Sequence, residues 1–384
     1  MNSANLNQIF EHYISRFDEL NNSQNSEYYK WEIAARFRPM LDEALQAEDV
    51  DFPAKLASVV SLTKQTIDNR YELSFYALTD YAKEKDASSA VRQALQDLLV
   101  PDNGDLSLRM QRFVDFLDFC HSMQEKYNPD SWRYTASIKL PMMITGYYDP
   151  DNYYFYKASQ AHAYADCVEF YDDWGSGINI DLNIYHRMCD ELVAAIKENP
   201  ALLEISKKRY GFSQKTLHPD KAYHILAFDI IFCSTVYHLY DGIHYSVKNA
   251  SEKKIYLEKK SEAEAALAAQ DEALELAANL DKAEMFFTQK LSIDSEIFHK
   301  TFGTGKIIDI PNEHTVAAIF SGKEAPVKLN WRTCITSNII SFKTTENASE
   351  YDEMVALIRR ADMIRRNVAL AEQKLQNYKD FFIE

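Results

Sequence analysis

Apolar side chains recur every three or four residues through most of the first 245 positions. The clearest example spans 5–20, where the spacing is that of an amphipathic helix: Leu6, Ile9, Phe10, Tyr13, Ile14, Phe17 and Leu20. The same periodicity predicts helices at 52–68, 70–84, 87–100, 105–126, 181–197 and 221–240. The tetrapeptide at 101–104, Pro-Asp-Asn-Gly, predicts a turn between two of them. The pattern therefore predicts one mainly helical domain over 1–245.

The helical pattern is interrupted at 132–157, where Pro141, Gly146 and Pro150 separate short runs. The segment 152–157 reads Asn-Tyr-Tyr-Phe-Tyr-Lys, an aromatic density that is typical of a strand. A strand of this kind buries one face and exposes the other. One hypothesis is that Tyr154 and Tyr156 stack on nucleic-acid bases, with Lys157 near a phosphate. The alternative is that these rings form the core of a small sheet.

Two long segments near the C-terminus carry an apolar repeat with alternating steps of three and four. In 251–291 it runs through Ala266, Ala269, Ala273, Leu276, Leu280, Ala283 and Phe287. In 349–380 it runs through Met354, Leu357, Ala361, Ile364, Val368, Ala371, Leu375 and Tyr378. This repeat predicts a long antiparallel coiled-coil hairpin. The alternative is that the two seams pair between chains and form a homodimer.

Between these two segments, residues 296–345 have a β-like pattern. Four short runs are predicted as strands, at 305–310, 315–320, 325–329 and 333–342. About 50 residues of short strands suit a small SH3-like or Tudor-like barrel. We therefore expect a mainly α protein: a helical N-terminal domain and a coiled-coil hairpin that carries a small β-barrel.

Composition and charge narrow the function. The chain has 384 residues, enough for two or three domains, and only 9 glycines and 10 prolines, which favours helices. Its net charge of −16 argues against a protein that coats nucleic acid without specificity. Residues 296–345 are the exception, because they hold six Lys or Arg against four Asp or Glu.

The cations of this segment are candidates for phosphate contacts: Lys300, Lys306, Lys328 and Arg332. Trp331 beside them offers a ring that could stack on a base. The alternative interpretation is a solvated surface with Trp331 in the barrel core.

Arginines in 349–380 lie beside the apolar seam. Arg360 and Arg365 fall at positions that face acidic residues of 251–291, whereas Arg359 and Arg366 point outward. The outward pair is predicted to contact a partner.

No residue pattern indicates catalysis or metal binding. The five cysteines are widely spaced and form no C-x-x-C pair, which favours a reducing compartment. The sequence Gly303-Thr304-Gly305-Lys306 is not a phosphate loop, since Lys300 stands where Gly is needed and Ile307 replaces Ser or Thr. We expect a cytoplasmic protein with no cofactor, no metal and no membrane segment, and not an enzyme.

Two resemblances add to this interpretation. Residues 5–240 resemble the N-terminal region of McrB-type modification-dependent restriction GTPases, through several matching pieces in order: Tyr29-Lys30-Trp31-Glu32, Val91-Arg92, Asp105-Leu106, Tyr147-Tyr148-Asp149-Pro150, Tyr153–Lys157 and Tyr223–Leu226. Residues 296–345 resemble the Tudor-like modules of UvrD-type helicases and RNA-polymerase-binding regulators, through Phe298-His299 and Phe302-Gly303-x-Gly305-x-Ile307.

The first resemblance implies a role in target recognition or partner contact in antiviral defence, although no motor domain follows in this chain. The second implies a barrel that binds protein or nucleic acid. We therefore expect a non-catalytic recognition or adaptor subunit that binds nucleic acid, or a motor NTPase or nuclease partner. The alternative is a purely protein-binding scaffold.

Overall fold

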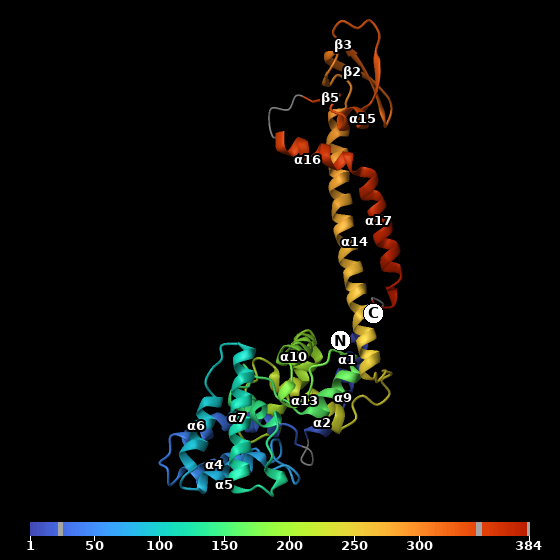
Figure 1. Cartoon of the computed structure of the whole chain (residues 1–384). Helices are drawn as coiled ribbons and strands as arrows, with labels where there is room; N and C mark the ends of the chain where they lie inside the picture. Colours follow the sequence, from blue (N-terminus) through green and yellow to red (C-terminus); the bar gives the residue numbers. More distant parts are fainter. Residues whose placement is uncertain (22–25, 343–347, 382–384) are drawn as a thin grey trace. The chain divides into compact units, whose positions relative to one another are not determined.

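The computed structural model describes residues 1–21, 26–342 and 348–381 (Figure 1). The chain divides into two compact units, Met1–Lys253 and Lys254–Glu384. Helices make up the first unit, whereas the second combines helices with a small antiparallel sheet. The prediction of a mainly helical chain with a small β-module is confirmed.

Helices of the first unit pack around a common hydrophobic core. Their bounds are α1 Ser3–Ser15, α2 Phe17–Leu20, α3 Tyr29–Leu45, α4 Phe52–Leu62, α5 Ser74–Lys83, α6 Ser88–Leu98, α7 Leu106–Tyr127, α8 Lys139–Tyr148, α9 Ala158–Cys167, α10 Leu182–Lys197, α11 Pro200–Lys207, α12 Arg209–Phe212 and α13 His224–Val236. Short 3₁₀ turns lie at Trp132–Tyr134 and Gly177–Asn179. The periodicity at 5–20 thus forms α1 and α2, and its apolar side, which includes Ile9, Phe10 and Tyr13, is buried.

The predicted turn at 101–104 separates α6 from α7. Asn103 and Gly104 both adopt positive φ angles, which glycine and asparagine accept at low cost. Asp105 then caps α7, because its carboxylate accepts hydrogen bonds from the backbone N–H groups of Ser107 and Leu108 at 2.9 and 3.1 Å. The turn chemistry therefore decides where the longest helix of this unit begins.

The predicted strand at 152–157 is wrong. Among the described residues of the first unit no strand is present, and this segment is an extended connection between α8 and α9. A side chain rather than a neighbouring strand bonds its backbone, because the carbonyl of Phe155 accepts a hydrogen bond from the Tyr185 hydroxyl. A Cβ on Gly146 of α8 would lie 2.9 Å from the Phe155 ring, so the segment packs directly on that helix. The aromatic side chains fill space between helices rather than one face of a sheet.

The second unit is built on the long helix α14 (Ala250–Lys290), which agrees with the helix predicted at 251–291. The single helix predicted at 349–380 is wrong, because the structure has two helices, α16 (Ala348–Arg359) and α17 (Ala361–Gln376). The chain turns at Arg360, whose N–H donates to the carbonyls of Ala356 and Leu357 at 3.3 and 3.0 Å. Figure 1 shows α16 crossing α14, whereas α17 runs beside it.

Contacts along the two helices show that α14 and α17 run in opposite directions. Tyr378 donates a hydrogen bond to Glu262 at 2.9 Å, and Arg365 lies 2.8 Å from Glu284. Most of the predicted seam of α14 is buried, from Ala266 to Phe287. Ala269 is an exception, because it is exposed. Packing at the α16 end also differs from the prediction, since Val355 and Ile358 are buried and the predicted seam residues, Met354 and Leu357, are only half-buried.

The sheet has five antiparallel strands in the order β4-β3-β2-β1-β5, curled into a half-barrel. The strands are β1 Glu296–His299, β2 Gly303–Asn312, β3 Thr315–Phe320, β4 Val327–Asn330 and β5 Ile340–Ser341. Three of the predicted strands are confirmed within a few residues. The strand predicted at 333–342 is wrong, because this stretch contains a short helix, α15 (Trp331–Thr336), before β5.

Two glycines shape the entry into β2 for different reasons. Gly303 has a φ of +71°, as expected for a tight turn. Gly305 instead faces the inside of the sheet, where an added Cβ would lie 2.7 Å from the Ile319 carbonyl and would also overlap the Phe320 ring. The inner side of the sheet is therefore packed closely against its own strands.

No helix in the described parts of the chain is long and apolar enough to cross a membrane.

Candidate functional site

The outer side of the sheet carries large apolar side chains beside lysines. β1, β2 and β3 pair so that Lys306 lies opposite both Glu296 and Ile319. Because successive side chains of a strand alternate between the two sides, residues two apart share a side. We call this surface the sheet face and define it by five exposed residues: Phe298, Lys306, Ile308, Ile319 and Lys328.

The inner side of the same strands is closed, whereas the sheet face is not. Ile297, Ile307 and Phe320 point inward and are buried against α14 and its neighbours. On the sheet face, Phe298 keeps 43% of its side chain exposed. Covering apolar area of this kind gains about 25 cal/mol per Å². Contiguous exposed apolar groups rimmed by polar residues are typical of interaction sites.

The lysines of this region remain accessible. Lys306 Nζ lies 3.6 Å from an Asp294 carboxylate oxygen, and both side chains are exposed, so the pair contributes less than about 1 kcal/mol. Lys300 and Lys328 are exposed, and neither has an ion pair within the part of the chain that the structure describes. Two exposed carboxylates lie on the same side, because Glu296 pairs with Lys306 and Asp309 pairs with Ala317 beside Lys328. The sheet face therefore combines apolar residues with charges of both signs, and its lysines can contact acidic groups of a partner.

Trp331 and Arg332 were predicted to contact nucleic acid, but both make contacts within the second unit. Asn330 caps α15 by accepting a hydrogen bond from the Thr333 N–H at 3.0 Å, and this turns Trp331 inward. Trp331 is 4% exposed, and its indole N–H donates to the Glu313 carbonyl at 2.7 Å. Arg332 lies 2.9 Å from Glu284 of α14. The exposed stacking role of Trp331 is therefore wrong, and Arg332 is paired with Glu284, which it shares with Arg365.

Tyr154 and Tyr156 are also buried, at 6% and 1% exposure. The Tyr154 hydroxyl donates to Asp190 at 2.6 Å, and its ring centre lies 4.1 Å from that of His224. The Tyr156 ring packs edge-on against Tyr185. Neither ring can stack on a base without unfolding its surroundings, so their predicted exposed role is wrong.

Lys157 points into the first unit rather than toward solvent. Its ammonium lies 4.8 Å from the centre of the Phe232 ring. Burial, followed by repulsion from the ammonium groups of Lys30 and Lys139, lowers the pKa of Lys157 to about 7. A buried lysine whose charged form is disfavoured is a poor phosphate ligand.

The two arginines predicted to contact a partner differ from each other. Arg359 donates to the Thr336 carbonyl at 2.8 Å and to the Asn338 amide oxygen at 3.2 Å, so it ties α16 to the segment after α15. Arg366 is exposed. The neighbouring Arg365 makes the ion pair with Glu284 that the repeat predicted.

A buried charged cluster, not predicted from the sequence, lies in the core of the first unit. Lys30 donates to Glu27 at 2.6 Å and also to Asp229. Arg209 lies 3.5 Å from the other oxygen of Asp229, and both Arg209 and Asp229 interact with the Tyr13 hydroxyl. Two cations thus face two carboxylates. The one sequence signal was Asp229, which interrupts the most apolar run of the chain.

The same cluster contains a group of possible metal ligands, Glu27, Asp229 and Cys233, whose ligand atoms lie within 4.8 Å of one another. Lys30 already occupies the position between the two carboxylates. Burial raises the pKa of the Cys233 thiol, and the Asp229 carboxylate raises it further, which disfavours the thiolate that a metal requires. The residues present therefore fit a closed ionic cluster better than a metal site.

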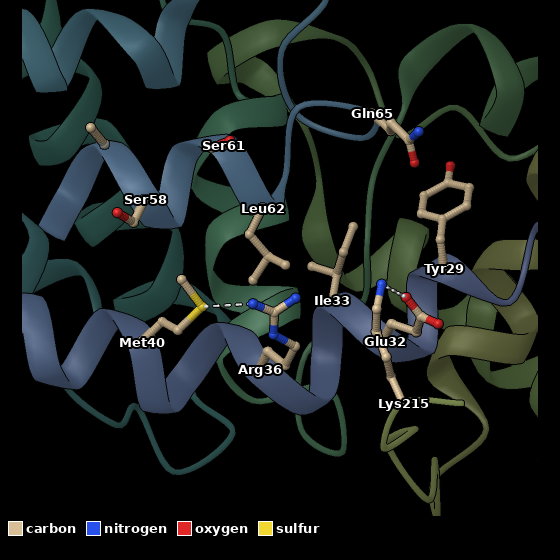
Figure 2. Close-up of a pocket in the computed structure, with 11 residues that line it drawn as sticks. Tyr29, Glu32, Ile33, Arg36, Met40, Ser58, Ser61, Leu62, Gln65 and Lys215 are labelled. Atoms are coloured by element: carbon tan, nitrogen blue, oxygen red, sulfur yellow. Dashed lines mark hydrogen bonds and ion pairs between the residues drawn. The ribbon is translucent and has the colours of Figure 1, made fainter. Parts of the chain in front are cut away.

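A groove of about 630 Å³ lies on the surface of the first unit, between α3, α4 and the segment that holds Lys215 (Figure 2). Glu32 on one wall accepts hydrogen bonds from Lys215 at 3.0 Å and from Ser213. Arg36 projects into the groove, with a guanidinium nitrogen 3.8 Å from the Met40 sulfur. Both polar and apolar side chains line the groove.

The buried cluster places the Cys233 thiol 3.5 Å from an Asp229 carboxylate oxygen, but both side chains are completely buried, so a substrate cannot reach them. In Figure 2 the Tyr29 hydroxyl points toward Gln65, and burial raises the pKa of Tyr29 well above its ordinary range. The five cysteines are free and buried. These groups are therefore better placed to hold the fold than to activate a substrate.

Comparisons with family models, with curated proteins and with solved structures find no match to this chain.

Proposed function

We propose that this chain is a non-catalytic adaptor that binds a partner protein through the sheet face. The observation that supports it best is the set of exposed apolar side chains, Phe298, Ile308 and Ile319, on strands whose other side is fully packed. Lys306 and Lys328 flank them, so the partner surface should be apolar with acidic neighbours.

The architecture suggests how the sheet face is presented. We propose that α14 and α17 form an antiparallel coiled-coil hairpin and that the sheet is an SH3-like or Tudor-like module at its end. The opposite directions of the two helices and the buried side chains between them, such as Leu280 and Ile364, support this arrangement. Modules of this size are common in adaptors because they expose much surface for few residues.

The resemblance of residues 5–240 to the N-terminal region of McrB-type GTPases supplies the biological setting. We propose that the chain works in the cytoplasm within a prokaryotic, nucleic-acid-directed defence system, and that its partner is a motor NTPase or a nuclease. The five free cysteines fit a reducing compartment. In this setting the helical unit supplies recognition and the sheet face recruits the enzyme.

Nucleic acid is a second candidate ligand for the sheet face. Phe298 could stack on a base, while Lys300, Lys306 and Lys328 contact phosphates. The protein partner is favoured because Trp331, Tyr154 and Tyr156 are buried and Arg332 is paired. Three lysines alone give weak, salt-sensitive binding.

Photo-crosslinking from the sheet face tests the proposal. The full chain with Phe298→p-benzoylphenylalanine is expressed in its native host, irradiated and examined for adducts. We expect one discrete adduct that a protease degrades and a nuclease does not. The matched control carries the same probe at Ile178, which is exposed in the first unit. An adduct sensitive to nuclease identifies the second candidate, and equal adducts at both positions contradict the proposal.

A further inference from the structure

A second groove lies within the second unit, along the side of the α14–α17 pair. It has a volume of about 340 Å³ and is independent of the sheet face. One wall belongs to α14 and includes Ala269, Glu272 and Leu276. The other belongs to α17 and includes Asn367, Leu370 and Lys374. The two helices are closely packed behind it, through Ile364 and Ala371 among others.

The two walls differ in the size of their side chains. On α17, Leu370 is 56% exposed, which is far more than a leucine of a closed two-helix interface. On α14, the facing wall is lined by Ala269 and Ala273, which leave room beside the helix. A large apolar side chain next to a shallow, small-residue surface is the arrangement that knobs-into-holes packing uses between helices.

The two walls also differ in charge. Glu272 stands on the α14 wall and Lys374 on the α17 wall. The contacts Glu262–Tyr378 and Glu284–Arg365 lie on either side of them, so both occupy a similar level along the helix pair. Within the described ranges, neither side chain has an ion pair. The groove thus has a negative charge on its α14 wall and a positive charge on its α17 wall, at a similar position along the helix axes.

We propose that a second copy of this chain covers the groove and forms a dimer whose two-fold axis runs parallel to α14. Such an axis places α14 of one copy over α17 of the other. Glu272 then faces Lys374 of the partner subunit, and Leu370 enters the small-residue wall of the partner's α14. An axis perpendicular to the helices would instead set Glu272 against its own copy. The charges therefore select the parallel arrangement.

The area of the face formed by α14 and α17 gives an expected size for the dimer interface. The 16 residues of α17 span about 24 Å, and two helices side by side are about 20 Å wide. The shared face is then about 500 Å² in each copy, or about 1,000 Å² in total, which is at the low end for a specific interface. The dimer should form with a micromolar dissociation constant and depend on protein concentration.

Charge exchange between two variants of the full chain tests the arrangement. In Glu272→Lys, the introduced ammonium group meets Lys374 of the partner subunit, and in Lys374→Glu two carboxylates meet. Each variant alone should stay monomeric in sedimentation velocity at concentrations where the wild type is dimeric. Mixed in equal amounts they should form a dimer, because both interface pairs of the heterodimer are then opposite in charge. Pairing within one chain cannot produce this rescue on mixing.

A matched pair of apolar variants tests the position of the interface. Leu370→Glu should remove the dimer. Leu274→Glu should not, because Leu274 is similarly exposed on α14, at 45%, but does not line the groove. Circular dichroism checks that both variants fold. The inference is overturned if the wild type is monomeric throughout the micromolar range, if mixing restores nothing, or if the two leucine variants behave alike.

Discussion

The two units differ in which apolar and charged side chains they expose to solvent. Eleven large apolar side chains are exposed among the described residues of each unit, although the second unit spans 131 residues (254–384) and the first 253. The first unit holds a charged cluster in its core, where Lys30 and Asp229 are completely buried. The second leaves Phe298, Ile319 and Leu370 in water on surfaces next to exposed charges.

This difference suggests that the charged core of the first unit contributes mainly to stability and that the exposed surfaces of the second unit contribute mainly to assembly. Breaking a buried ion cluster is strongly destabilising, because it leaves a buried charge without its partner. A unit with exposed apolar faces is stabilised further when those faces are covered. Substitutions in the first unit should therefore change stability, whereas those on the surfaces of the second should change assembly.

The largest effect is expected from Asp229→Asn. This change keeps the shape of the side chain but leaves Lys30 and Arg209 with one carboxylate fewer in a buried site. We expect a loss of about 3–5 kcal/mol in the free energy of unfolding, measured by urea denaturation. The control is Glu43→Gln, whose exposed pair with Lys55 should contribute less than about 1 kcal/mol. If Asp229→Asn lowered the free energy of unfolding no more than Glu43→Gln does, the buried cluster would not contribute to stability as we expect.

Trp331→Ala should have the next largest effect, because it empties part of the core of the second unit. The loss of a buried tryptophan costs about 3 kcal/mol or more. Hydrogen exchange of β2 and β3 measures it locally. Trp132→Ala removes an equally large ring that is exposed in the first unit, and it should change the free energy of unfolding by no more than about 0.5 kcal/mol.

Lys157 gives the first unit a dependence on pH. Its pKa is lowered to about 7 in the folded state and is near 10.4 in the unfolded chain. Below pH 10 the unfolded chain binds this proton more readily, so stability is lost as pH falls toward 7 and regained as pH rises. Between pH 7 and 9 the wild type should gain up to about 1.4 kcal/mol per pH unit relative to Lys157→Met. Urea midpoints that shift in parallel for both proteins would contradict this.

The smallest effect on stability is expected from Ile319→Ser on the sheet face. Ile319 is exposed, so the free energy of unfolding should change by less than about 1 kcal/mol in urea denaturation. The same change should reduce partner binding. A large loss of stability with unchanged binding would mean that the sheet face belongs to the fold rather than to an interface.

Elements with strong periodicity could be predicted from the sequence, as α14 and the strands β2 and β3 show. The break at Arg360 could not, because the apolar repeat continues through it and neither Gly nor Pro marks it. The helix that buries Trp331 was missed because the alternation of β4 continues past Asn330 when only side-chain polarity is considered. Asn330 is a helix-capping residue type, and that was the available signal.

Sites were harder to predict than elements. Aromatic residues at 153–156 have the same local pattern whether they form a strand or fill space between helices, and only their neighbours decide between the two. The buried cluster joins Lys30 to Asp229 across 199 positions of sequence, so no local pattern could link them. The exposure of Lys306 and Lys328 could be expected from the sequence, because charged side chains on a short strand need no distant partner, whereas their ligand stays a prediction.

The most direct test of the account is the yield of the protein adduct formed from a benzoylphenylalanine at position 298, measured with native lysines and with Lys306→Glu and Lys328→Glu combined. The account predicts a strong loss of adduct in the charge-reversed chain, with circular dichroism and the urea midpoint of both chains alike. An adduct of undiminished yield would contradict the claim that the sheet face binds an acidic partner.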